Sequence, residues 1–219
     1  MARGGTQAPR LGSLDLRGLA SAEGIELLAG DALEARDLGD VDIVGRSLTE
    51  LDLEECAIGT LSASDADLRG LRLRESTIER LDAPVFRAPR SSWRGVRVAS
   101  GRIGSAELYD ARLDDVRLRG MKLGFVNLRS SVLDDVLIED SVIDELDLGG
   151  ARLTRVAFVR CEIREITAGG ATLRDVDLRG VQLSSISDVA QLRGATVDGD
   201  QIAQLAPLLA RAAGLIIED

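Results

Sequence analysis

The residue types that carry most enzyme chemistry are scarce in this sequence of 219 residues. It contains no histidine, which excludes Ser-His-Asp and Cys-His triads, imidazole general bases and histidine zinc ligands. The two cysteines, Cys56 and Cys161, form no Cys-x-x-Cys pair, so neither a zinc nor an iron–sulfur site is indicated. No Walker A, Gly-x-Ser-x-Gly or EF-hand pattern occurs either. We therefore expect no cofactor and no metal site.

The backbone that would position any other functional side chains follows a five-residue repeat. An apolar residue stands at every fifth position from Leu28 to Leu183, at all 32 positions. The residue two before it is mostly small or apolar, and the two after it are mostly Gly, Asp, Glu, Arg or Ser. A period of five fits neither an α-helix nor a continuous strand. It fits a chain that turns a corner every five residues and stacks its coils, so the sequence predicts an all-β solenoid.

The units Ala66–Gly70, Ala111–Asp115 and Val176–Gly180 carry a small residue, then a polar one, then leucine and two variable residues. This pattern resembles the pentapeptide-repeat family. The resemblance implies a right-handed quadrilateral β-helix with four units in each coil, hence about eight coils. We expect an N-terminal tail and cap in residues 1–25, the β-helix in 26–187, and a C-terminal helix and cap in 188–219.

Stacking residues twenty apart gathers basic side chains on the outside of this rod. Residues 23–82 carry a net charge of −10, whereas residues 83–122 carry +5. Like charges on neighbouring strands repel, so such a patch is a candidate site for an acidic partner segment or a phosphate. The alternative is a solvated surface that nearby aspartates neutralise. The residues of the predicted patch are Arg97, Arg102, Arg117, Arg119 and Lys122.

An apolar patch is expected on the next coil. Val132, Leu137 and Val142 occupy three consecutive outward positions, where polar side chains are the rule, and acidic residues flank them. Phe125, Ala157 and Val159 add apolar surface nearby. An exposed apolar patch with a polar rim predicts a protein interface. The alternative is that a β-branched residue on a strand face needs no partner.

The solenoid needs a cap at its C-terminal end. Asp200 could begin a helix over residues 200–213 that Gly214 ends, with Ile202, Leu205 and Leu209 on one face. That face could plug the last coil or join two chains in a homodimer, and the two roles are compatible.

The interior of the rod is predicted from the same register. Cys56 and Cys161 lie five coils or about 25 Å apart, too far for a disulfide, and both point inward. Trp93 is expected between Leu73 and Leu113 on one column of the core.

These patterns favour a non-enzymatic scaffold that binds a protein partner. Carboxylate pairs on a convex rod lie in no cleft that would raise a pKa or exclude water. The net charge of −10 argues against binding nucleic acid. No secretory or membrane-spanning segment is found in the sequence, so the cytoplasm is the expected location. The resemblance implies one alternative: some pentapeptide-repeat proteins, including quinolone-resistance proteins, mimic DNA and bind DNA gyrase.

Overall fold

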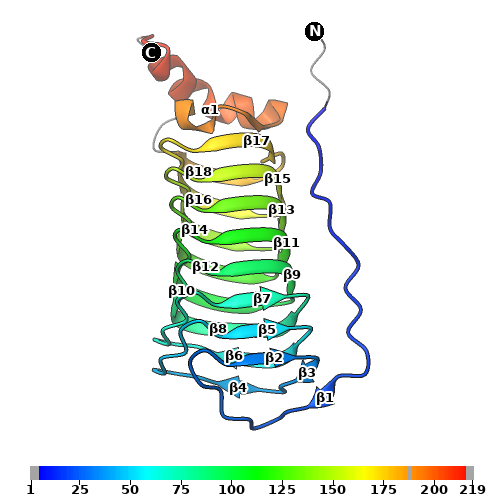
Figure 1. The fold of residues 1–219 in the computed structure, drawn as a ribbon. Coiled ribbons are helices and arrows are strands. Elements are labelled where there is room, and N and C mark those ends of the chain that lie inside the picture. Colours follow the sequence, from blue (N-terminus) through cyan, green and yellow to red (C-terminus); the bar gives the residue numbers. More distant parts are fainter. Residues whose placement is uncertain (1–4, 187–188, 216–219) are drawn as a thin grey trace.

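The chain forms a parallel β-solenoid with one C-terminal helix (Figure 1). A computed structural model describes residues 5–186 and 189–215. Residues twenty apart are neighbours on adjacent strands, as in the column from Leu73 through Trp93 to Leu113. This register confirms the predicted coil of twenty residues. None of the described helices is long and apolar enough to cross a membrane.

Corners recur every five residues. Ala35, Asp115 and Asp135 adopt the left-handed backbone conformation, with φ of 53°, 54° and 55°. Asp and glycine tolerate this region better than most residues, which explains why they collect at these positions. We name the four sides of a coil in chain order: side A contains Leu108, side B Leu113, side C Leu118 and side D Leu123. Every residue twenty positions away lies on the same side.

Strands in the middle of the rod bend from side B into side C or from side D into side A. The first five strands, β7 and the last strand are only two or three residues long, and all the described pairings are parallel. The bounds are β1 Ala20–Ser21, β2 Ala32–Glu34, β3 Arg36–Asp37, β4 Val41–Asp42, β5 Asp52–Glu54, β6 Ala57–Ser62, β7 Arg72–Arg74, β8 Thr77–Arg87, β9 Ser92–Val98, β10 Gly101–Glu107, β11 Arg112–Arg119, β12 Met121–Asn127, β13 Val132–Glu139, β14 Val142–Asp147, β15 Arg152–Val159, β16 Glu162–Thr167, β17 Thr172–Asp177, β18 Gln182–Ile186 and β19 Ala195–Thr196.

The inward columns form one continuous apolar core. Trp93 is 4% exposed and donates its indole N–H to Ser91 Oγ at 3.0 Å. Its ring meets the ring of Phe86 edge to face at 6.2 Å. Cys56 and Cys161 are buried and unbonded to each other, as expected. Desolvation by burial raises the pKa of both thiols.

The ends of the rod differ from the expectation. The solenoid has about nine turns rather than eight, because β1 pairs with β3 and β19 pairs with β17, outside the five-residue register. At the first coil Leu28 is 55% exposed and its neighbour Leu27 is buried instead. The five-residue spacing of buried residues therefore does not extend to the end of the first coil, where no further coil packs against it.

The C-terminal helix α1 spans Gly199–Ala212, and a short 3-10 helix, η1 (Val189–Leu192), precedes it. Asp198, not Asp200, is the N-cap: its carboxylate accepts from Gln201 N, and its own backbone N–H donates to Gln201 Oε1. The predicted apolar face is split, since Leu205 is buried whereas Ile202 and Leu209 are 46% and 38% exposed. The predicted boundary at residues 187–188 lies outside the described residues.

Candidate functional site: two outer surfaces of the middle coils

The predicted basic patch has the expected register. Arg97 on β9 is the neighbour of Arg117 on β11, and Arg102 on β10 is the neighbour of Lys122 on β12. The first pair lies on side C and the second on side D. The patch therefore wraps round a corner of the rod.

On side C, each of the three arginines of the patch forms an ion pair with a carboxylate of this chain. Arg97 is largely buried, and its Nη2 lies 2.7 Å from Asp115 Oδ1. Arg117 Nε donates to Glu139 Oε1 at 2.7 Å. Arg119 Nε donates to Asp140 at 3.2 Å. These bonds match the alternative of a surface neutralised by its own acids, although the acids Glu139 and Asp140 come from the next coil.

On side D, the two remaining cations are exposed, and neither forms an ion pair with any described residue. Asp82 is the strand neighbour of Arg102 but pairs with Arg80 instead. The cations border a shallow hollow of about 500 Å³, whose lining includes Arg102, Gly104, Lys122, Gly124, Val142, Asp144 and Arg164. At its far end Arg164 Nη1 pairs with Asp144 at 2.8 Å.

Two glycines make the floor of this hollow. A Cβ at Gly104 would lie 2.6 Å from Pro84 O, and one at Gly124 would collide with Gly104 O. Side chains are therefore excluded here by the close approach of successive coils. The result is a shallow groove with cations on the edge, which suits an anionic group of a partner.

The predicted apolar patch is not one surface. Val132, Leu137 and Val142 are five residues apart, so they lie on sides B, C and D and face different directions. Consecutive outward positions lie on successive sides of a four-sided coil, and the prediction of a contiguous patch overlooked this. Their side chains are half-buried, as are those of Phe125 and Val159.

Only part of the predicted patch comes together. Ala157 is the strand neighbour of Leu137 on side C, and Val159 is the neighbour of Glu139. Ala157 is only 7% exposed, so it adds little surface. Phe125 lies apart, between Ser105 and Glu145. The structure therefore leaves a small apolar strip, and no residue of the patch ranks among the exposed large apolar side chains of the described chain.

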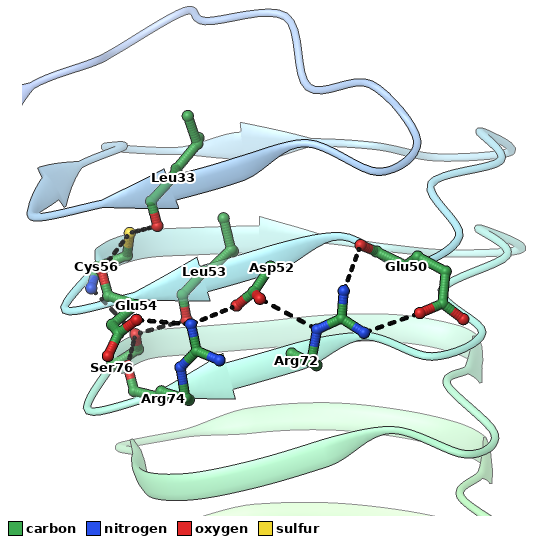
Figure 2. A network of polar contacts seen from close by, with 9 residues as sticks. All are labelled: Leu33, Glu50, Asp52, Leu53, Glu54, Cys56, Arg72, Arg74 and Ser76. Atoms are coloured by element: carbon green, nitrogen blue, oxygen red, sulfur yellow. Dashed lines mark hydrogen bonds and ion pairs between the residues drawn. The ribbon is translucent and has the colours of Figure 1, made fainter.

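Figure 2 shows a polar network on side B near the N-terminal end of the rod. Arg72 donates to Asp52 at 3.0 Å and to Glu50 at 2.8 Å, while Arg74 donates to Glu54 at 2.6 Å. The hydrogen bond that Arg72 donates to Asp52 raises the pKa of the Arg72 guanidinium. Two arginines of one coil thus neutralise three carboxylates of the preceding coil.

The sequence contained a readable signal for this network. Asp52 and Arg72, and likewise Glu54 and Arg74, carry opposite charges at a separation of twenty residues. The predicted surface patches rest on like charges in register, so these pairs of opposite charge were not among them.

Comparison with known proteins gives a weak likeness. No family model matches the chain, and no curated protein matches it. Three solved structures of QnrB1, described as a plasmid-mediated fluoroquinolone resistance protein, are similar to it. One trypsin-treated variant shares 16% identity, with 91% of this chain and 98% of that chain covered and a TM-score of 0.40. A second shares 14%, covers 83% and 100%, and has a TM-score of 0.34. Full-length QnrB1 shares 14%, covers 79% and 99%, and has a TM-score of 0.24.

Proposed function

We propose that the protein is a non-enzymatic scaffold of the pentapeptide-repeat type that binds an acidic segment of a partner protein in the hollow on side D. One observation carries the proposal. Arg102 and Lys122 are stacked on adjacent strands, exposed, and not ion-paired within the described chain. Like charges in register repel, and a bound carboxylate would relieve that repulsion. Val142 in the same hollow offers apolar contact beside the cations.

The experiment places a photo-crosslinking residue at Val142 in the full chain and exposes it to a lysate of the organism that makes the protein. We expect a crosslinked protein product that falls at least tenfold when Arg102→Glu and Lys122→Glu are added, because both cations then repel the acidic segment. The matched control is Arg94→Glu with Arg112→Glu, two exposed arginines of side B without an ion pair in the described chain. An equal product from both double variants would contradict the proposal.

A homodimer through α1 is part of the same proposal. Ile202, Leu208 and Leu209 are 36–46% exposed on a helix whose first turns already plug the last coil. Apolar side chains on one helix are a common means of pairing two copies. Light scattering should give twice the chain mass for the wild-type protein and the single mass for Leu209→Arg. A wild-type monomer would remove the dimer from the proposal.

A gyrase-binding DNA mimic is the second candidate, favoured by the net charge of −10 on a rod. Against it, Arg72 and Arg74 hold the carboxylates of Glu50, Asp52 and Glu54, so these acids do not form a free stripe like the phosphates of DNA. A supercoiling assay separates the candidates. Inhibition or protection of gyrase at low micromolar protein would favour the mimic, and no effect would remove it.

A further inference from the structure

The N-terminal segment, residues 5–19, is an extended strap along the outside of the rod. Figure 1 shows it leaving β1 at the first coil and passing the successive coils to reach the level of the last ones. It crosses the strands, in contrast to β1, which pairs with β3 as part of the sheet. The strap was expected only to be a tail and cap, so its contacts were not predicted.

The strap is held through its backbone by carboxylates of one corner. Gln7 N donates to Asp175 Oδ1 at 3.2 Å, and Arg10 N donates to Asp135 Oδ1 at 2.8 Å. Gly12 N donates to both carboxylate oxygens of Asp115 at 3.2 Å. These three acids are separated by forty and twenty residues, so they stack on the corner between sides B and C. We call Asp115, Asp135 and Asp175 the corner column.

The spacing of the column matches an extended chain. Asp115 and Asp175 are three coils apart, about 14 Å at the spacing of neighbouring strands. The five steps along the chain from Gln7 to Gly12 span about 16 Å when extended. The strap can therefore present one N–H to each acid with only a slight bend.

The corner column is built in advance of the strap. Each of its aspartates adopts φ of 53–55° as part of its coil, which fixes the direction of the side chain. Arg155 donates two hydrogen bonds of 2.6 Å to Asp135 and orients that carboxylate. Arg97 completes the site, because its Nη2 donates to Gly12 O at 2.8 Å while it also bonds Asp115.

Little apolar burial secures the strap. Every residue from 5 to 19 is half-buried or exposed, including Leu11, Leu14 and Leu16. Hydrogen bonds to charged acceptors contribute less at an exposed surface than in a desolvated site. The strap is therefore bound by a few replaceable bonds, and its connection to β1 supplies a high local concentration.

We propose that the corner column with Arg97 is a binding site for an extended peptide backbone, and that the strap occupies it until an extended segment of a partner protein displaces it. The acids accept backbone N–H groups, so the site recognises extended conformation more than side-chain identity. One position is tight: a Cβ at Gly12 would lie 3.0 Å from Asp115 Oδ2, so any larger residue there would require that carboxylate to shift. This site is separate from the hollow on side D and does not depend on its function.

The experiment uses the full chain and a fluorescent peptide with the sequence of residues 5–19. Arg10→Pro with Gly12→Pro removes two donated N–H groups and frees the column without altering it. In fluorescence anisotropy, the peptide should bind this variant at least tenfold more tightly than the wild-type protein, whose own strap competes. Adding Asp115→Gly and Asp135→Gly should abolish the binding, because glycine keeps the left-handed corner but removes the acceptors.

The matched control is Asp110→Gly in the same proline variant. Asp110 is a left-handed corner residue with φ of 57° on a different corner, and the control should bind the peptide unchanged. A peptide carrying the two prolines itself should not bind. Hydrogen exchange of the wild-type protein provides the second readout, and the amides of Gln7, Arg10 and Gly12 should be protected. Peptide binding that is independent of Asp115 and Asp135, no binding to the proline variant, or unprotected amides would each overturn the proposal.

Discussion

Arg155 lies one coil beyond Asp135 at the same corner of the rod, and its Nε and Nη2 each donate a 2.6 Å hydrogen bond to that carboxylate. The two residues are twenty positions apart and both adopt left-handed backbone conformations. Arg160 and Asp140 repeat the relationship at the next corner. Outward charges of this solenoid thus pair between coils, so a shift of one coil along its neighbour would break several such pairs together.

Arg155→Lys tests how much this ion pair contributes to the free energy of unfolding. Lysine retains the charge but cannot make two parallel bonds to one carboxylate. Because both side chains are largely buried, at 20% and 13% exposure, we expect the free energy of unfolding to fall by about 1–2 kcal/mol. Urea denaturation measures the change. Arg152→Lys, at an exposed position without an ion pair in the described chain, should change it by less than about 0.5 kcal/mol, and equal effects would contradict the account.

The same pair predicts a pH dependence. The hydrogen bonds from Arg155 lower the pKa of Asp135 below its usual value of 3.8. A carboxyl whose pKa is lower in the folded state stabilises the fold above the unfolded pKa, and this stabilisation is lost as the pH falls through the folded pKa. The difference in urea midpoint between wild type and Arg155→Lys should therefore be full at pH 7 and should shrink as the pH falls below the usual value of 3.8. A constant difference would show that the lysine variant acts by another route.

The floor of the side D hollow predicts unequal effects of adding a methyl group. Gly124→Ala places a Cβ against Gly104 O of the preceding coil, so we expect a loss of about 2–3 kcal/mol. Gly180→Ala meets nothing within 4 Å and carries only the strain of φ at 72°, about 1 kcal/mol. Chemical denaturation of both variants measures the contrast. Equal losses would mean that the coils do not approach closely at Gly124.

The two cysteines should be inert in the folded protein. Burial raises the pKa of both thiols, and Cys56 Sγ donates to Glu54 O at 3.3 Å. One coil further, Ser76 Oγ makes the equivalent bond to Arg74 O at 2.7 Å. Cys56→Ser should therefore cost less than about 1 kcal/mol, because the serine hydroxyl can donate the same bond to Glu54 O. Ellman's reagent should label no thiol until urea is added, and rapid native labelling would contradict the burial.

The sequence predicted the interior better than the surface. The five-residue period places Trp93 between Leu73 and Leu113 and both cysteines inside, because the core of a solenoid repeats with its register. It also placed Arg97 beside Arg117. Outward residues five apart are close in sequence but lie on different sides of the coil. Val132 and Leu137 were therefore wrongly joined in one patch.

The strap lay beyond prediction for a different reason. Its hydrogen bonds use the backbone N–H groups of Arg10 and Gly12. Every residue except proline has such a group, so the amino-acid types in the strap do not indicate which acids accept these bonds. The acids that accept these bonds resemble any other corner aspartate. Only the path of the chain brings the two together.

Outward residues twenty apart lie side by side on neighbouring coils of this solenoid. The most direct measurement is disulfide formation in Arg152→Cys with Thr172→Cys, two exposed neighbours on side B. Cα atoms about 5 Å apart suit a disulfide, so oxidation should leave only the two buried native thiols, Cys56 and Cys161. Arg152→Cys with Gln182→Cys, on sides B and D, should keep all four thiols free. Crosslinking within the second pair but not the first would contradict the twenty-residue coil.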